Sequence, residues 1–426
     1  MKRIFVFILV FALLPVFALA EGPAEDVMAL IAAEDFDALY AISDEGVQSQ
    51  LGSAQGFTQA WGQIEATFGA YKSYSDVSSV QTGGLEVYSV TCDFEKASAT
   101  LTLVFDGYGK LAGLTVADYS MKQVEIADEG GYVEEDVTLR PGEADATGGT
   151  LTLPEGDGPF PCVIMMQGSG PSDRNETAYG FPVFQALARA LAPRGVASVR
   201  YDKYTYAHPD QTAGNAAFTV DDEYTYDAAA ALALLRADAR IGDIYLLGHS
   251  EGAMVAPRVA EKIGAEGLSG LVLLAGSPLP LTDILMRQMK DMGADEATLA
   301  GYQAQFDAMA GMSDDALQAQ IVLGAPLYYW RDVADYDYAG EIVRLNLPVF
   351  IAQGEKDFQV LPAEGIEAYE AALSGFDGAT YARYPDMTHM LADISVEMTG
   401  TAADYTSLAG IDVALADDVA QWMLAR

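Results

Sequence analysis

The sequence predicts an α/β protein with a mostly parallel sheet and a helical cap insertion, preceded by a small α+β domain. From residue 124 onward, short apolar runs alternate with longer segments of helical spacing. This is the pattern of repeated strand–helix units in a sheet that is covered on both faces. Residues 24–120 differ, because helical spacing comes first and strand-like alternation follows. A chain of 426 residues that is 51% hydrophobic is long enough to bury a core in each part.

The first twenty residues have the pattern of a secretory signal peptide. Lys2 and Arg3 form a positive start, an apolar run extends over residues 4–17, and residues 18–20 read Ala-Leu-Ala, a cleavage-site pattern. The run is shorter than the roughly 20 apolar residues that span a bilayer, and the alternative is an uncleaved membrane anchor. We therefore expect a secreted or extracytoplasmic protein that begins near Glu21, with no stable membrane span after signal cleavage.

Composition limits the partners of this chain. It has 62 Asp and Glu against 23 Lys and Arg, a formal net charge of −39, and such a charge repels nucleic acid and anionic membranes. We expect no nucleic-acid partner.

Cys92 and Cys162 lie in different expected domains, in strand-like runs, which favours two buried thiols over a disulfide. No Cys and His residues have metal-ligand spacing, so we expect no metal and no cofactor. The sequence sets no oligomeric state.

Residues 24–120 are expected to form one compact α+β domain. The expected helices are residues 27–40 and 57–68, and the expected strands are residues 85–90, 99–105 and 110–116. Gly83-Gly84 and Asp106-Gly107 supply turns between strands. This order, with a strand meander curled around a helix, resembles the small nuclear-transport-factor-2-like domains. The segment contains no His and no convincing pair of carboxylates, so we expect it to be non-catalytic.

Residues 124–426 are expected to form the second domain, whose strand–helix alternation has one interruption. The expected strands are residues 132–139, 149–153, 162–166, 197–201, 244–247, 271–274, 349–352 and 380–384. The expected helices are residues 181–191, 220–239, 252–263 and 366–373, with a last one that ends near residue 426.

The interruption, residues 278–347, has helical periodicity and no strand pattern, and we expect it to form a helical cap over the active site. It is rich in Met and ends in the run Leu327-Tyr328-Tyr329-Trp330. These side chains either pack the cap helices together or form an adaptable apolar wall for an acyl or aromatic substrate. Trp330 is the substrate-binding candidate from this segment.

The sharpest local motif is a G-x-S-x-G segment, Gly248-His249-Ser250-Glu251-Gly252. It stands between an expected strand and an expected helix, which is the context of a nucleophile elbow in an α/β-hydrolase fold. A turn this tight has no room for side chains beside the serine, which accounts for the flanking glycines. The turn presents the Ser250 hydroxyl as nucleophile, and the backbone N–H of Glu251 then points to where an oxyanion forms.

The general base must be one of three histidines. His249 adjoins Ser250 and points elsewhere in such an elbow. His208 precedes the nucleophile, whereas His389 follows the last strand. The chain order of this fold is Ser, then acid, then His, which His389 fits and His208 does not.

The acid belongs after the strand that precedes this histidine. Asp357 in the segment Gln-Gly-Glu-Lys-Asp is the main candidate, and its role is to hold one tautomer of His389. Glu355 is a rival, and Asp386 is a second rival that lies very near His389 in the same loop.

A second oxyanion donor is expected from the glycine-rich loop at residues 167–174. Glycines let a backbone approach the substrate closely. We favour the N–H of Ser169, with Gly168 as a substrate-binding candidate. Arg174 and Lys203 either shape the site or meet a substrate carboxylate, and the structural alternative is that they pair with Asp173 and Asp202. Arg174 is retained as a substrate-binding candidate.

Together these pieces resemble bacterial α/β-hydrolase-fold carboxylesterases of the lysophospholipase-like or acyl esterase kind. The matching segments are Gly168-Ser169-Gly170-Pro171, Asp173-Arg174, Arg200-Tyr201-Asp202-Lys203, GHSEG, Gln-Gly-Glu-Lys-Asp and the late His389. The chain departs from the usual family pattern at Gln167, at Asn175-Glu176 and at Tyr204.

The resemblance implies ester hydrolysis without a cofactor, acting on a small-molecule ester. One alternative is a serine peptidase or aminopeptidase resembling the prolyl oligopeptidase branch, which shares the Ser, Asp and His set but usually carries a large propeller domain. The other alternative is a non-catalytic binder on a hydrolase scaffold, against which the complete set of Ser250, Asp357 and His389 argues.

Overall fold

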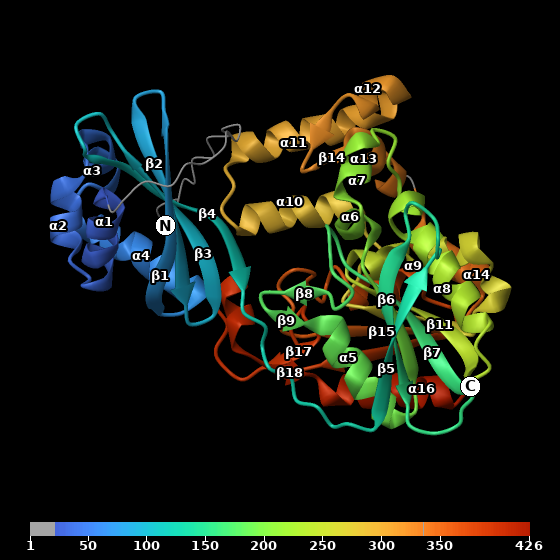
Figure 1. Cartoon of the computed structure of the whole chain (residues 1–426). Coiled ribbons are helices and arrows are strands. Elements are labelled where there is room, and N and C mark those ends of the chain that lie inside the picture. Colours follow the sequence, from blue (N-terminus) through green and yellow to red (C-terminus); the bar gives the residue numbers. More distant parts are fainter. Residues whose placement is uncertain (1–21, 335) are drawn as a thin grey trace. The chain divides into compact units, whose positions relative to one another are not determined.

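The computed structural model describes residues 22–334 and 336–426, so the predicted signal peptide lies outside the described residues. The described chain divides into two compact units, one ending at Val124 and one comprising Glu125–Arg426 (Figure 1). None of the described helices is both long and apolar enough to cross a membrane. Cys92 and Cys162 lie one in each unit, and both are free, buried thiols as predicted.

From residue 22 onward, the first unit combines four helices with a four-stranded antiparallel sheet. Its helices are α1 (Pro23–Ala32), α2 (Phe36–Ile42), α3 (Glu45–Leu51) and α4 (Ala54–Phe68). Its strands are β1 (Tyr71–Thr82), β2 (Leu85–Phe94), β3 (Ala97–Phe105) and β4 (Leu111–Met121), which pair in chain order. Trp61 and Phe68 of α4 pack on Phe94 of β2, with ring centroids 5.9 and 5.5 Å away. A meander with a helix against one face is the arrangement that the nuclear-transport-factor-2-like resemblance implied.

The helix expected over residues 27–40 is two helices, α1 and α2. Glu34 adopts a left-handed conformation, with φ of 53°, just after α1 ends. Asp35 then starts α2 as its N-cap, because its carboxylate accepts the N–H of Ala38 at 3.0 Å. The apolar spacing continues through this break, so periodicity alone does not reveal it.

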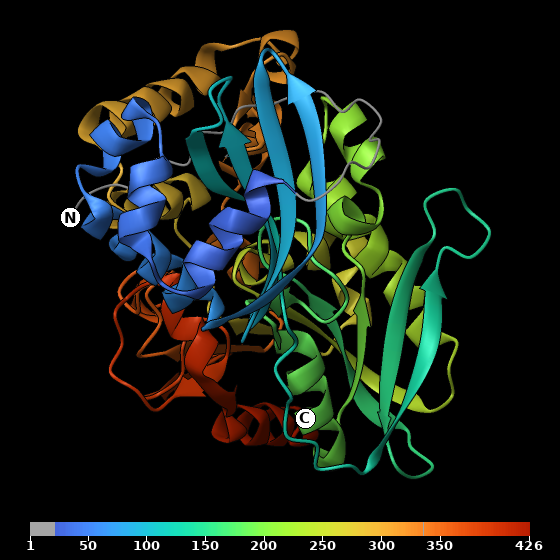
Figure 2. The ribbon, with the colours of Figure 1, turned by 60° about the vertical axis from the view of Figure 1, so that its left-hand side comes forward.

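The second unit is built on an eight-stranded, mostly parallel sheet. Its strands are β5 (Tyr132–Leu139), β6 (Thr147–Pro154), β7 (Phe160–Met166), β10 (Ala197–Tyr201), β11 (Ile241–His249), β12 (Gly270–Leu274), β15 (Val349–Gly354) and β16 (Ala379–Tyr384). Their order across the sheet is β16-β15-β12-β11-β7-β10-β6-β5, and the strands from β16 to β10 are parallel. The antiparallel β5–β6 hairpin forms one edge, at the right of Figure 2. The predicted fold class is therefore confirmed.

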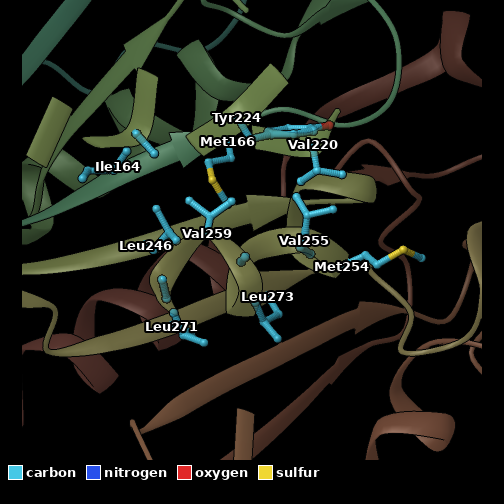
Figure 3. Packing of buried hydrophobic residues seen from close by; sticks show 14 of the residues in the cluster. Ile164, Met166, Val220, Tyr224, Leu246, Met254, Val255, Val259, Leu271 and Leu273 are labelled. Atoms are coloured by element: carbon cyan, nitrogen blue, oxygen red, sulfur yellow. The ribbon is translucent and has the colours of Figure 1, made fainter. Parts of the chain in front are cut away.

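Helices cover both faces of this sheet. On one face lie α5 (Val183–Leu191) and α16 (Val413–Leu424), and on the other lie α8 (Tyr226–Arg236), α9 (Glu251–Ile263), α14 (Tyr338–Leu345) and α15 (Ile366–Ala372). Figure 3 shows the second layer, where Val259 of α9 lies beside Met166 and Leu246 of the strands, all fully buried. Full burial of such a side chain contributes about 1.5–3 kcal/mol. This packing fixes the position of α9 and, with it, the position of Ser250, the residue just before the helix.

The insertion between β12 and β15 is mainly helical. Its helices are α10 (Leu281–Asp291), α11 (Glu296–Ala308), α12 (Asp314–Gln318) and α13 (Leu327–Ala334). It also contains a short hairpin, β13 (Ile321–Val322) and β14 (Ala325–Pro326), where no strand was expected. Leu323 and Gly324 form its two-residue turn with positive φ, and a leucine gives no sequence signal for such a turn. Within the insertion, α14 packs on α9 in the helix layer, whereas α10 to α13 lie outside the layers.

The smaller elements lie in the connections of the second unit. They are β8 (Thr177–Ala178), β9 (Phe181–Pro182), α6 (Tyr204–Ala207), α7 (Pro209–Gly214), β17 (Ala392–Ile394) and β18 (Leu408–Ile411). The long helix expected over residues 220–239 begins with a π-helical turn, Asp221–Thr225, and α8 then ends at Arg236. Such π turns are frequent at functional sites, and this one carries two side chains that reach the site described next.

Candidate active site

Ser250 stands in the turn between β11 and α9. Its φ of 55° and ψ of −119° lie outside the regions that ordinary residues favour, which is the strain of a nucleophile elbow. The turn closes because the residues two positions before and after Ser250 are glycines. A Cβ on Gly248 would lie 2.2 Å from the carbonyl oxygen of Gly252, and one on Gly252 would lie 2.3 Å from that of Met166. The N–H of Ser250 donates to the oxygen of Leu274 at 2.9 Å, which ties the turn to β12.

We expect Gly252→Ala to destabilise the second unit. The new Cβ would lie 2.3 and 2.5 Å from the backbone oxygens of Met166 and Gln167, which cannot swing aside as a flexible side chain does. Overpacking of this kind costs about 1–3 kcal/mol, which lowers Tm by several degrees in calorimetry. Gly214→Ala is the control, because a Cβ there meets nothing within 4 Å. Equal Tm values for the two variants would contradict this account of the elbow.

Asp357 and His389 form a buried pair in the loops that follow neighbouring strands β15 and β16. Nδ1 of His389 is 2.8 Å from Oδ2 of Asp357, and each residue is 3% exposed. Oδ2 also accepts from the Gln353 amide at 2.7 Å, and Oδ1 accepts the N–H groups of Gln359 and Val360 at 2.9 Å each. With donors on every side, the carboxylate cannot turn. It therefore holds His389 with a proton on Nδ1 and leaves Nε2 to act as a base.

The rival candidates have other partners. Glu355 lies 3.6 Å from an arginine of β16, and Asp386 lies 2.8 Å from Nζ of Lys356. His208 lies between α6 and α7, where its ring packs on Tyr204. The structure thus brings together Asp357 and His389 and keeps the other acids and His208 apart from that pair. Among residues 22–334 and 336–426, no group of His, Cys, Asp or Glu side chains is placed to hold a metal ion.

His249 connects the elbow to the loop that carries His389. Its Nε2 is 2.7 Å from the backbone oxygen of His389, and its Nδ1 is 2.9 Å from Oε1 of Glu176. A carbonyl oxygen only accepts, so Nε2 carries a proton. Burial disfavours a charged ring, but the Glu176 carboxylate, the hydrogen bond to the oxygen of His389 and the charge of Asp357 together outweigh burial and raise the pKa of His249. His249, the residue directly before Ser250, therefore holds the backbone of His389 close to the elbow.

The loop after β7 places Gly168 directly against Ser250, the candidate nucleophile. A Cβ on Gly168 would lie 3.1 Å from Cβ and 3.6 Å from Oγ of Ser250. The N–H of Gly168 donates to Oε1 of Glu176 at 2.6 Å, so it is not directed at a substrate. Glu251 is the first residue of α9, where a backbone N–H has no acceptor within the helix. The amides of Ser169 and Glu251 stay the predicted oxyanion donors.

Arg174 and Trp330, both predicted to bind substrate, have partners within the protein. Nη2 of Arg174 pairs with Oδ2 of Asp202 at 2.8 Å, and its Nη1 donates to the oxygen of Gly149 at 2.9 Å. Trp330 is 6% exposed, and its Nε1 donates to the oxygen of Val322 at 2.7 Å. The planar guanidinium of Arg174 matches the carboxylate of Asp202. The indole N–H of Trp330 has its acceptor, Val322, inside the insertion. These contacts favour the structural alternative for both residues.

Five buried side chains form an acid–tyrosine cluster behind the elbow: Lys203, Glu223, Tyr224, Glu251 and Tyr329. The Tyr329 hydroxyl is 2.6 Å from Oε2 of Glu223 and 2.8 Å from Oε1 of Glu251. One hydroxyl proton serves only one carboxyl group, so the second carboxyl group must carry its own proton. Burial, followed by the charge of Glu223, raises the pKa of Glu251 to about 7, and Glu223 pairs with the Lys203 ammonium group, so both observations favour Glu251 as the protonated member.

We expect Glu251→Gln to flatten the pH dependence of stability. The pKa of Glu251 is raised from its ordinary 4.5 to about 7 in the fold. Its contribution to the free energy of unfolding is therefore present below pH 4.5 and is lost as the pH rises through 7. Between pH 5 and 8, the native Tm should fall more than that of the variant. Glu266→Gln, at an exposed position, is the control; parallel Tm curves for the native protein and Glu251→Gln would contradict this assignment.

Sequence reasoning missed most of this cluster and misplaced one pairing. Lys203 pairs with Glu223, at 2.6 Å, rather than with Asp202, because Arg174 already occupies Asp202. No motif marks Glu223. Tyr329 was visible only as part of an aromatic run, and the structure directs it, rather than its neighbour in that run, to the elbow.

The family comparison agrees with this geometry. A family described as "Alpha/beta hydrolase family" matches residues 163–398, more than half of the chain, and that range contains Ser250, Asp357 and His389. The chain therefore belongs to the alpha/beta hydrolase family. Residues 24–114 match a second family, described as "Protein of unknown function (DUF3887)".

Individual relatives are also similar. Esterase EstD of Thermotoga maritima is 27% identical over an alignment of 431 positions. The alignment covers 99% of this chain and 100% of that protein. Among solved structures, Est1E from Butyrivibrio proteoclasticus is 14% identical, covering 68% of this chain and 99% of that chain with a TM-score of 0.44. The esterase domain from a Rhodothermus marinus protein is 13% identical, covering 68% and 97% with a TM-score of 0.41.

Proposed function

We propose that this protein is a serine esterase that hydrolyses small-molecule carboxylic esters through a covalent acyl-enzyme. The observation that carries the proposal is the buried pair of Asp357 and His389, tethered to the strained elbow of Ser250. Membership of the alpha/beta hydrolase family and the likeness to a protein named as an esterase support an ester as the substrate. The chemistry needs no cofactor.

Acylation starts when Oγ of Ser250 attacks the ester carbonyl carbon while its proton moves to Nε2 of His389. Asp357 keeps its hydrogen bond with Nδ1–H and stabilises the imidazolium without taking the proton. The N–H groups of Ser169 and Glu251 donate to the oxyanion of the tetrahedral intermediate. When that intermediate collapses, the bond to the alcohol oxygen breaks and the imidazolium protonates the departing alcohol.

Deacylation repeats these steps with water. His389 removes a proton from water as the water oxygen attacks the acyl carbon, and the same two N–H groups receive the second oxyanion. Collapse breaks the bond to Ser250, whose oxygen regains the proton from His389. The carboxylic acid leaves and the site is restored.

The test is turnover by the purified mature protein on two substrate series. One series is p-nitrophenyl esters of increasing acyl length, and the other is aminoacyl p-nitroanilides. We expect saturable hydrolysis of the esters, with the acyl-length profile measuring the size of the pocket. Hydrolysis of the anilides in preference to the esters would replace the esterase with a peptidase. If the protein hydrolyses neither the esters nor the anilides, the proposed function is wrong.

We also propose that the protein is exported, on the pattern of its first twenty residues. Expression of the full chain in a bacterial host should yield a soluble extracytoplasmic product. Mass spectrometry should give it an N-terminus near Glu21. A full-length product that stays with the membrane fraction would instead support the uncleaved anchor.

A further inference from the structure

The peptide bond between Gly168 and Ser169 decides whether the predicted oxyanion hole is formed. In a trans peptide, the oxygen of Gly168 and the N–H of Ser169 point in opposite directions. If this peptide were turned over, the oxygen would face the reaction centre and repel a developing oxyanion. Gly168 itself permits a wide range of conformations, and a Cβ there would lie only 3.1 Å from Cβ of Ser250. The orientation must therefore be set by groups around the loop.

Lys203 holds the carbonyl side of this peptide. Its Nζ donates to the oxygen of Gly168 at 2.7 Å, and the hydroxyl of Tyr224 lies 3.3 Å from the same oxygen. The Lys203 side chain is 1% exposed, so water hardly competes for this hydrogen bond. Glu176 holds the preceding N–H of Gly168 at 2.6 Å. Buried charged groups thus hold both peptide planes that meet at Gly168.

Every proton of the Lys203 ammonium group has an acceptor. Besides the oxygen of Gly168, Nζ lies 2.7 Å from the hydroxyl of Tyr224 and 2.6 Å from Oε1 of Glu223. An ammonium group has three donors, so none remains for a substrate carboxylate. A buried ammonium is tolerated only when it is paired and hydrogen-bonded, and this complete set of partners gives Lys203 one position.

We propose that Lys203 is a positioning residue for catalysis, which turns the Ser169 N–H toward the oxyanion by holding the oxygen of Gly168. This inference rests on the proposed esterase function. The partners of Lys203 are Gly168, Tyr224 and Glu223, so its effect on catalysis passes through the peptide. Glu223 holds Lys203 and also accepts from Tyr329 of α13 at 2.6 Å. The orientation of the oxyanion peptide is therefore linked to a helix of the insertion.

The test compares Lys203→Met with the double variant Lys203→Met/Glu223→Gln. The single variant leaves Glu223 buried without its partner, whereas the double variant removes both charges. Fluorophosphonate titration counts competent sites, so each kcat is expressed per site. We expect kcat to fall about 10²- to 10³-fold in both variants, the loss seen when one oxyanion donor is removed, with KM little changed. Lys203→Gln, which keeps an N–H donor, should recover part of the rate.

A transition-state analogue separates positioning from general damage. An alkyl trifluoromethyl ketone forms a hemiketal whose oxyanion occupies the same hole, so its Ki should rise in proportion to the fall in kcat/KM. Lys262→Met, at a half-exposed lysine of α9, is the matched control and should leave both constants unchanged.

The outcomes are distinct. A double variant that titrates fully and retains the native kcat and Ki would overturn the role of Lys203. So would a variant that loses titratable sites but turns over at the native rate per site, because Lys203 would then serve only stability. If the native protein itself hydrolyses no ester, the proposed function is overturned, and the role of Lys203 with it.

Discussion

Replacing Ser250 with alanine is expected to lower kcat for ester hydrolysis about 10⁶-fold, because the residues of such a unit act together and the nucleophile cannot be substituted. The strained elbow provides no second hydroxyl at this position. The variant should fold normally, since the change removes one oxygen and keeps the two flanking glycines. Initial rates with a p-nitrophenyl ester measure the effect.

Ser374→Ala is the matched control for this substitution. Ser374 is exposed and lies just beyond α15, so its loss should leave the rate unchanged. If Ser250→Ala kept a rate within tenfold of native after trace contaminants were excluded, another residue would have to be the nucleophile.

Replacing Asp357 with asparagine should lower kcat about 10⁴-fold. The carboxylate accepts from His389, Gln353 and two backbone N–H groups, whereas an amide offers only one acceptor oxygen. The amide nitrogen would then face donors, and His389 would be held in the wrong tautomer. The loss should appear in kcat, measured at saturating ester, with KM changing little.

Glu355→Gln is the control for the acid, because Glu355 lies in the same loop but faces Arg383, whereas His389 pairs with Asp357. It should keep close to native activity. An Asp357→Asn variant as active as this control would show that the pair seen in the structure does not serve catalysis.

The candidate catalytic residues could be proposed from sequence because each is marked by local pattern and chain order. Gly248 and Gly252 reflect a turn in which a Cβ at either of these two positions would strike backbone. His389 was favoured because it alone of three histidines follows the acid. Asp357 was favoured by its place after a strand, a feature that depends on backbone organisation rather than on distant side chains.

The groups behind the elbow were not predictable in the same way. Lys203, Glu223 and Tyr329 come from separate segments, and which of them meet depends on how a π turn and α13 pack. The departure from the family pattern at Asn175-Glu176 was noticed, but its meaning required the structure. Glu176 holds both Gly168 and His249, which no spacing in the sequence indicates.

The most direct test of the central claim is to locate the covalent adduct formed by a fluorophosphonate. Native protein treated with the reagent should gain the mass of one phosphonyl group, and peptide mapping should place that group on Ser250. Ser250→Ala should gain none. An unmodified native protein, or an adduct on any other residue, would contradict the assignment of Ser250 as the nucleophile and the esterase mechanism built on it.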